Sequence, residues 1–268
     1  MSPFEIRLLG APGILLDGAP SKSIRRKALA LLAYLALEAR PTRRETLAAL
    51  LWPEYSPEQA SAYLRRAVWE LRQALGQDCL EGEGDELAFI AQRRAAVDVQ
   101  RFRELLQQAA GEAESAAALD FLKQAVSIYQ GHFMAGFSLP DSPGFDEWQL
   151  FQSESLRNEQ SGALEKLSLG CESAQNLADA LEYARLWLEL DLLNEAAHRR
   201  LMVIYARMGQ RSAALRQYEL CKEALWQQLS VRPQPETRQL YEAIRRGEFA
   251  AEAVRAPVPL NREQPAPG

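Results

Sequence analysis

Cysteine and histidine are scarce in this chain of 268 residues, and their spacing excludes several kinds of site. Cys79, Cys171 and Cys221 lie far apart, are odd in number and form no CxxC pair. This pattern argues against a disulfide framework or a zinc site and fits a reducing cytosol. His132 and His198 have no H-x-x-H or H-E-x-x-H spacing, and we interpret His198 as a surface or packing residue. We therefore expect no metal and no cofactor.

Long apolar runs, a leader segment and a phosphate loop are also missing. The longest apolar run, Ala28–Leu37, is far shorter than the ~18 residues of a membrane span, and no basic segment with an apolar core opens the chain. No GxxxxGK[ST] occurs, and the glycines around Glu83 are better explained as a turn. The nearby carboxylates lack EF-hand spacing, so a solvated loop is preferred to a calcium site. No constellation of residues supports an enzyme, and no membrane partner is expected.

Positive charge is scarce overall but concentrated in one window. The net charge of −5 by itself argues against a nucleic-acid binder. Between Pro20 and Leu75, however, ten Lys and Arg stand against five acids, a surplus of +5, which leaves −10 on the remainder. A basic island on an acidic protein is typical of a small DNA-reading module joined to a partner-binding body.

The span Ser56–Gly76 is the most informative stretch. Ser56 and Pro57 suit a helix start, and at ~100° per residue one stripe is apolar: Ala60, Leu64, Ala67, Val68, Leu71 and Leu75. The opposite arc carries side chains that read bases or bind phosphates: Gln59, Ala62, Arg65, Arg66, Trp69 and Gln73. A solvated face of an ordinary amphipathic helix is the alternative. For Trp69, packing under a wing is favoured slightly over stacking on DNA.

The preceding and following segments predict the N-terminal fold. Short strands are expected at Phe4–Gly10 and Gly13–Gly18, and a helix at Lys27–Glu38. Thr42–Glu45 has capping-box spacing and opens a second predicted helix, Arg43–Leu51. After the Glu81–Asp85 turn, Leu87–Ala91 and Val97–Val99 are predicted to form a hairpin that carries Arg93 and Arg94. This order predicts a winged helix-turn-helix whose third helix enters a groove.

The chain beyond Asp98 is predicted to be helical to about Gly247. The expected helices are Val99–Ala110, Ala116–Tyr129, Phe145–Gln175, Leu177–Leu190, Glu195–Arg207, Arg211–Leu229 and Pro235–Arg246. A 34-residue offset pairs Leu167 with Leu201, Ala180 with Ala214 and Leu181 with Leu215, which is the period of a tetratricopeptide repeat. A generic helical bundle is the alternative. The proline-rich end is expected to be an unstructured tail or linker.

Together these patterns predict a mainly α protein. An N-terminal winged helix-turn-helix (α+β) at residues 1–98 precedes an all-α, TPR-like helical-repeat domain at residues 99–247, and residues 248–268 form the tail. From the charge distribution, the helical body is expected to bind no DNA.

Several motifs resemble one family of bacterial regulators, the streptomycete antibiotic regulatory protein type. The similar segments are RRKALALLAYLAL (Arg25–Leu37), ETLAALLWP (Glu45–Pro53), LRRAVWELRQALG (Leu64–Gly76), VDVQRF (Val97–Phe102) and ALRQYELCKEAL (Ala214–Leu225). The resemblance implies an OmpR-like winged helix joined to a bacterial transcriptional activation domain, in a cytoplasmic, nucleoid-associated activator. It also implies double-stranded promoter DNA and RNA polymerase as partners, with self-association on direct repeats.

The predicted DNA contacts fall into two groups. Arg65 and Arg66, with Gln59, Ala62, Trp69 and Gln73, are expected to face the bases. Arg43 and Arg44 at a helix start, with Arg93 and Arg94 in the hairpin, are expected to hold phosphates on either side of the groove. The competing hypothesis is a helical-repeat adaptor whose N-terminal module docks protein rather than DNA, as the front of a larger ATPase-type signalling regulator.

Overall fold

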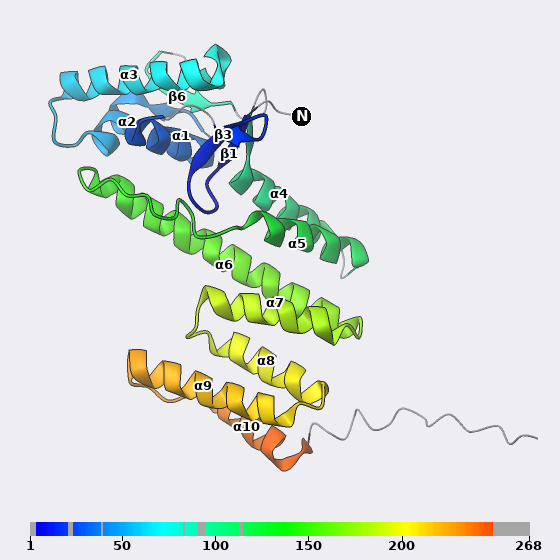
Figure 1. Ribbon diagram of the computed structural model, residues 1–268. Coiled ribbons are helices and arrows are strands. Elements are labelled where there is room, and N and C mark those ends of the chain that lie inside the picture. Colours follow the sequence, from blue (N-terminus) through cyan, green and yellow to red (C-terminus); the bar gives the residue numbers. More distant parts are fainter. Residues whose placement is uncertain are drawn as a thin grey trace, which may run out of the picture. The chain divides into compact units, whose positions relative to one another are not determined.

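The computed structural model describes residues 4–20, 24–38, 40–82, 84–90, 95–112 and 115–248 (Figure 1). The chain divides into two compact units, Met1–Ala163 and Leu164–Gly268. The long helix α6 (Pro143–Ser173) begins in the first unit and ends in the second. The candidate interface lies in the first unit, and the repeats lie in the second.

A small sheet opens the first unit. β1 (Phe4–Arg7) and β2 (Gly13–Leu16) pair antiparallel and confirm the two predicted strands. β3 (Ala19–Pro20) continues the sheet beside β2, while β7 (Ala95–Val97) lies parallel to β1 on the other side. The strand order is therefore β3-β2-β1-β7.

Three helices follow this sheet, and each has an apolar side to bury. They are α1 (Arg26–Glu38), α2 (Arg44–Leu51) and α3 (Pro57–Leu75), close to the predicted ranges. The capping box predicted at the start of α2 is wrong. Arg43 is the N-cap, and no side chain caps the helix, because Thr42 and Arg43 form the short strand β4. Extended backbone at this point moves the helix start by one residue.

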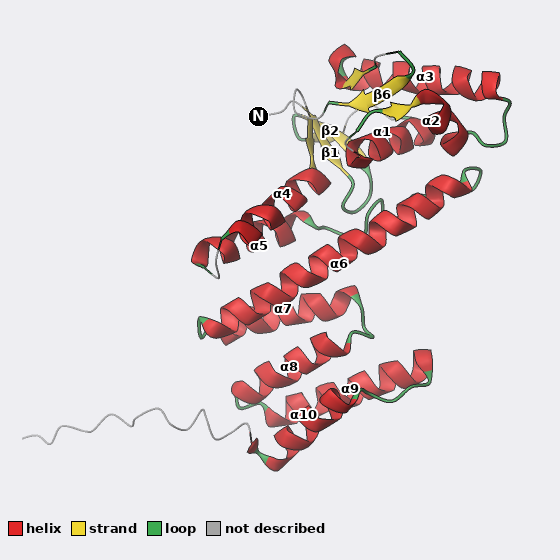
Figure 2. Cartoon of the chain, turned by 180° about the vertical axis from the view of Figure 1, so that it is seen from behind, coloured by secondary structure: helices red, strands yellow, loops and turns green. Residues whose placement is uncertain are grey.

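The second sheet corrects the predicted hairpin. β6 (Glu86–Phe89) pairs antiparallel with β5 (Leu80–Glu81) on one side and with β4 on the other. The short 3-10 helix Gln77–Cys79 links α3 to β5. The expected partner of β6, the segment near Val97, joins β1 instead. The hairpin is therefore β5–β6, which lies on either side of the predicted turn cluster (Figure 2, strands in yellow).

The first unit continues beyond the second sheet. α4 (Asp98–Gly111) and α5 (Ala116–Ile128) pack side by side. The Asp98 carboxylate accepts hydrogen bonds from the backbone N–H groups of Leu8 and Leu9 at 2.7 and 2.8 Å, and from Val99 at 2.7 Å. The segment after α5 returns to β1 through a bridge between Leu9 and Phe133. One apolar core therefore extends from β1 into α6.

The second unit is a stack of helices: the end of α6, then α7 (Leu177–Leu190), α8 (Glu195–Arg207), α9 (Arg211–Leu229) and α10 (Pro235–Arg246). The predicted 34-residue offset matches packing. Ala180 and Ala214 are both fully buried, and the left-handed turns at Gln175 and Gly209 (φ 61° and 75°) are also 34 residues apart. The helical part is TPR-like. Within the described residues, no helix is both long and apolar enough to cross a membrane.

Candidate nucleic-acid interface

The N-terminus of helix α3 is fixed by a capping box. The Ser56 hydroxyl accepts from the Gln59 backbone N–H, and the Gln59 side chain accepts from the Ser56 N–H, each at 3.4 Å, which completes a capping box. Ser56 Oγ also donates to Glu58 at 2.8 Å. Hydrogen bonds to its own backbone N–H and to Ser56 lower the pKa of Glu58. The Gln59 amide oxygen is therefore engaged in the cap, which restricts its predicted contact with bases.

The two sides of α3 separate as the sequence pattern predicts. All six residues of the predicted apolar stripe are buried: Ala60, Leu64, Ala67, Val68, Leu71 and Leu75. All six residues of the opposite arc are exposed: Gln59, Ala62, Arg65, Arg66, Trp69 and Gln73. The buried side packs against α1 and α2, so the exposed arc has a fixed direction relative to the rest of the unit.

Several basic residues of the positive window are engaged within the protein. The Arg25 backbone N–H donates to Glu70 at 2.7 Å, and Lys27 forms an ion pair with Asp141 at 2.7 Å. The remaining engaged residues are Arg26, which bonds the Ser138 carbonyl, Arg40, which pairs with Glu38, and Arg72, which bonds the Leu80 carbonyl. Lys27 is held inside the first unit, whereas the Arg25 and Arg40 side chains have partners but stay 61% and 80% exposed.

Four arginines of the window remain available. In the part of the chain that the structure describes, the side chains of Arg43, Arg44, Arg65 and Arg66 form no hydrogen bond or ion pair. Arg65 and Arg66 are exposed near the middle of α3. An arginine side chain without a partner inside the protein can bind an anion such as a DNA phosphate. These four residues are therefore the candidates for contact with DNA.

Arg43 and Arg44 lie where β4 passes into α2. Arg43 is exposed and sits opposite Glu86 in the β4–β6 register. The Arg44 backbone N–H donates to the Asp85 carbonyl at 2.8 Å, and a Cβ atom on Gly82 would lie 2.8 Å from Nη2 of Arg44. The end of the Arg44 side chain therefore lies close to Gly82, which follows β5. Arg93 and Arg94 lie outside the described residues.

Aromatic side chains form a feature of this region that the sequence did not predict. Tyr63 stacks on Trp52, with ring centroids 6.2 Å apart, and meets Tyr55 edge to face at 4.9 Å. The packing preferred for Trp69 is wrong, because 62% of this residue is exposed. Trp69 is on the exposed arc with Arg65 and Arg66. The spacing of Trp52, Tyr55 and Tyr63 around the α2–α3 turn was the available signal for the aromatic cluster.

The buried titratable groups include two cysteines and a histidine. Burial raises the pKa of the Cys79 thiol to about 11 and that of Cys221 to about 12. Burial also lowers the pKa of His198, whose Nε2 is 3.0 Å from the Leu192 carbonyl and whose Nδ1 is 2.7 Å from the Gln217 amide nitrogen. The described residues contain no group of three or more His, Cys, Asp or Glu suited to a metal ion.

Comparison with protein families decides the assignment. The family described as "Bacterial transcriptional activator domain" matches residues 97–245, more than half of the chain. The chain belongs to the bacterial transcriptional activator domain family. The match begins at Val97, so it covers α4 to α10 and leaves α3 outside the matched range. The family is that of a domain acting in transcription, and its residues here include α4 and α5 of the first unit as well as the TPR-like helices of the second.

The chain is also similar to two curated regulators. It is 29% identical over 239 residues to "Regulatory protein AfsR" of Streptomyces griseus, covering 85% of this chain and 23% of the relative. It is 29% identical over 224 residues to "Regulatory protein AfsR" of Streptomyces coelicolor, covering 80% of this chain and 21% of the relative. The chain therefore spans about a quarter of the length of these relatives, and the matched regions are longer than the family domain.

A solved structure has a similar fold. Mycobacterium tuberculosis EmbR, solved in complex with a low-affinity phosphopeptide, superimposes with a TM-score of 0.70 at 22% identity. The similarity covers 92% of this chain and 66% of that chain. A match over 92% of this chain extends well beyond the family domain, so it reaches the N-terminal part as well.

Proposed function

We propose that the chain is a sequence-specific, DNA-binding transcriptional regulator and an activator. Its N-terminal part, α1–α3 with the flanking sheets, acts as an OmpR-like winged helix. In this proposal α3 is the helix that enters the major groove, and the β5–β6 hairpin with the segment that follows it lies beside the DNA backbone. The order of the elements, membership of the transcriptional activator domain family and similarity to the AfsR proteins support the proposal.

The observation that carries the proposal is the outward face of α3. Arg65 and Arg66 are exposed and without an internal partner among the described residues, whereas neighbouring basic residues are engaged inside the unit. Arginine is the residue that most often contacts guanine through its O6 and N7 atoms, and it also binds phosphate. Trp69 and Gln73 extend the same face by about one and two further turns. Together they provide charge, hydrogen-bond donors and an aromatic surface on one side of one helix.

Phosphate contacts complete the proposed interface. Arg43 and Arg44 stand at the start of α2, where the partial positive charge of the helix also favours an anion. Arg93 and Arg94 belong to the connection between β6 and β7, outside the described residues. We assign all four to phosphates rather than to bases. Such contacts set the register of the protein on DNA and carry little sequence information.

The TPR-like helices are assigned to protein partners. The charge outside the basic window is negative, which opposes contact with a DNA backbone. Stacked helical repeats provide concave surfaces suited to protein segments. We propose RNA polymerase as the partner, together with self-association between neighbouring copies bound to direct repeats of promoter DNA.

Binding-site selection followed by a gel shift tests the proposal. The full chain is mixed with a pool of random duplexes, and bound DNA is recovered and sequenced over several rounds. A selected sequence bound at least 10³-fold more tightly than random DNA is within the range of specific regulators. Repeating the gel shift at two salt concentrations then gives the number of phosphate contacts. Recovery of no enriched sequence, with binding no tighter than to random DNA, would refute sequence-specific recognition.

The exposed aromatic residues favour a second candidate, a protein-docking adaptor. Trp69, Tyr63 and Tyr55 are 62%, 40% and 44% exposed on α3 or just before it, and aromatic residues are enriched in protein interfaces. In this alternative the N-terminal module binds protein within a larger ATPase-type signalling regulator. The same selection separates the two candidates, because an adaptor enriches no DNA sequence.

A further inference from the structure

Two adjacent cations open helix α1, at the end where a helix disfavours positive charge. Arg26 and Lys27 are the first two residues of α1, and its first turn contains no acidic residue. The partial positive charge of a helix N-terminus repels cations, so the formation of the helix gives no reason for this pair. Both side chains contact residues of the segment 137–142 instead. This segment belongs to the matched family domain, which begins at residue 97.

Lys27 joins α1, the end of α2 and the segment before α6 at one point. Its ammonium group donates to the Leu51 carbonyl at 2.6 Å, pairs with the Asp141 carboxylate at 2.7 Å and lies 5.5 Å from the centre of the Trp52 ring. The hydroxyl of Ser142, a fully buried residue, donates to the same Leu51 carbonyl at 2.8 Å. Leu51 ends α2, and the last carbonyls of a helix have no partner within it. Two side chains from outside α2 therefore bind its last carbonyl.

Arg26 binds the same segment a few residues earlier. Its guanidinium group donates to the Ser138 carbonyl at 2.6 Å and lies 4.8 Å from the centre of the Phe137 ring. The segment is also bonded to the first turn of α6, because the Asp146 carboxylate accepts from the Leu139 backbone N–H at 2.7 Å. Residues 137–142 therefore connect α6 with the start of α1 and the end of α2.

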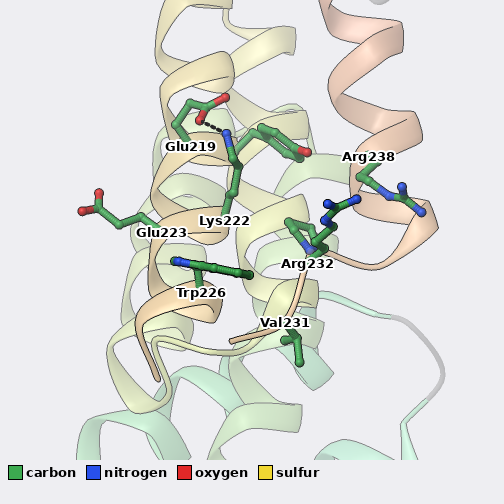
Figure 3. A pocket seen from close by; sticks show the side chains of 9 residues that line it. Glu219, Lys222, Glu223, Trp226, Val231, Arg232 and Arg238 are labelled. Atoms are coloured by element: carbon green, nitrogen blue, oxygen red, sulfur yellow. Dashed lines mark hydrogen bonds and ion pairs between the residues drawn. The ribbon is translucent and has the colours of Figure 1, made fainter. Parts of the chain in front are cut away.

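An ordinary surface ion pair in the second unit differs from this arrangement. Glu219 and Lys222 pair at 2.9 Å along α9, beside a groove lined by α9, α10 and the loop between them (Figure 3). The side chains of Glu219 and Lys222 are 55% and 56% exposed, and such pairs contribute little to stability. The Lys27 side chain is only 18% exposed, whereas that of Asp141 is 54% exposed. Lys27 is thus mostly enclosed by its partners, and Asp141 can be replaced without opening the core.

The contacts of Lys27 continue to α3 through two aromatic rings. Trp52 follows α2 directly, and its ring stacks on that of Tyr63, with centroids 6.2 Å apart. Tyr63 lies on α3, two and three residues before Arg65 and Arg66. The Trp52 ring therefore interacts with the Lys27 ammonium group as well as with α3. Its position helps to set the direction in which the two arginines point.

We propose that Lys27, held by Asp141 and Ser142, is a positioning residue for DNA reading by α3 and couples this helix to the activator domain. The proposal rests on the proposed function, in which Arg65 and Arg66 contact bases. A bidentate contact with a base requires a defined placement of the guanidinium group, whereas a phosphate contact depends mainly on charge. Because coupling between two sites is reciprocal, DNA bound at α3 stabilises the contacts of residues 137–142 to the same degree. The activator domain is thereby linked to the DNA-bound state of the chain.

Asp141→Asn tests this coupling, because it removes the ion pair of Lys27 and alters no residue of the proposed DNA interface. In gel shifts with the full chain, we expect affinity for the selected sequence to fall by about 2-fold to 30-fold, the range of couplings carried by residues that do not touch the ligand. Affinity for random DNA should not fall, because no phosphate contact is lost. Asp141→Glu keeps the carboxylate and should stay near the wild type. The matched control, Glu219→Gln, removes the same charge from a carboxylate of similar exposure and should change neither affinity.

Fluorine NMR of the full chain follows the same contact without DNA. The chain has five tryptophans, so labelling with 5-fluorotryptophan gives a small set of resonances, and Trp52→Phe identifies that of Trp52. Asp141→Asn should move the Trp52 resonance, whereas Glu219→Gln should leave it in place. An unmoved Trp52 resonance in Asp141→Asn would overturn the proposal.

The gel shifts separate a positioning role from a merely structural one. If Asp141→Asn kept the wild-type ratio of affinities for selected and random DNA, the contact would serve the fold alone and the proposal would be overturned, even with a moved Trp52 resonance. A wild type that selects no sequence is a different result. It would refute DNA reading by α3 itself, and the positioning role would fall with it.

Discussion

Replacing Arg65 and Arg66 together by alanine is the most direct test of α3 as a DNA-reading helix. Both side chains are exposed, and neither forms a hydrogen bond or ion pair with another described residue. Alanine is also a strong helix former, so the capped helix should persist. We therefore expect the free energy of unfolding to change by no more than about 0.5 kcal/mol, as for ordinary surface substitutions.

The expected effect on DNA binding is much larger. A bidentate contact to a base contributes about 1–3 kcal/mol of discrimination. Two such contacts amount to about 2–6 kcal/mol, which corresponds to a loss of affinity from about 30-fold to about 10⁴-fold at 1.4 kcal/mol per tenfold. Affinity for random DNA should fall much less, because only the charge contribution is lost there. A gel shift with the selected sequence and with random DNA measures both quantities.

The control must remove the same charge elsewhere. Arg245 and Arg246 are likewise adjacent, lie in the last turn of α10 and form exposed ion pairs with Glu242 and Glu248, and Arg245 also lies over the Tyr241 ring at 6.0 Å. Their double alanine variant should bind the selected sequence as the wild type does. Unfolding curves in urea confirm that both variants are folded. If the folded Arg65 and Arg66 variant kept wild-type affinity and preference, α3 would not be the reading helix.

Three further predictions concern phosphate contacts, a structural carboxylate and a buried imidazole. Alanine at Arg43 and Arg44 should weaken binding to selected and random DNA by similar factors and reduce the salt slope by about 0.9 per lost contact, whereas a changed base preference would refute the assignment. Asp98→Asn should lower the free energy of unfolding by about 1–3 kcal/mol. The asparagine NH₂ group is a donor, and it must face at least one of the three backbone N–H donors that now bind the carboxylate. An unchanged midpoint of urea unfolding would contradict this prediction. Burial lowers the pKa of His198, so the folded state favours the neutral imidazole. This contribution to the free energy of unfolding is fully present above pH 6.5 and is lost as the pH falls through the lowered pKa. Urea unfolding at several pH values should show the loss, and His198→Gln should make the free energy of unfolding less dependent on pH.

The helices could be predicted from the sequence because their signals are local. The apolar stripe of α3 and its start at Ser56 and Pro57 fix the helix, its buried side and its exposed arc without reference to other parts of the chain. The same holds for the 34-residue offset, which repeats the positions of small buried residues such as Ala180 and Ala214. The spacing of apolar residues predicts which side of a helix is buried. In α3 every residue of the predicted apolar stripe is buried, and every residue of the opposite arc is exposed.

Strand pairing and side-chain partners could not be predicted in this way. The segment near Val97 was assigned to β6 because it is close in sequence, but it pairs with β1, more than 90 residues away. Local pattern cannot choose between these partners, because each offers a similar apolar strand. Likewise, only the fold shows that Lys27 forms an ion pair with Asp141, whereas the Arg65 side chain has no ion-pair partner among the described residues.

The continuity of the first core determines how DNA binding and activation can be separated. A chain ending near Asp98 would remove Phe102 and Phe145, both fully buried in one core with Ile6 and Leu8. Truncating a single buried phenylalanine costs about 3–5 kcal/mol, and a whole domain has only about 5–15 kcal/mol of stability. We therefore expect such a fragment to unfold, so its failure to bind DNA would reveal nothing about the role of the helical repeats. Surface substitutions on α7–α10 leave this core intact. Loss of activation with retained DNA binding in those variants would assign activation to the repeats.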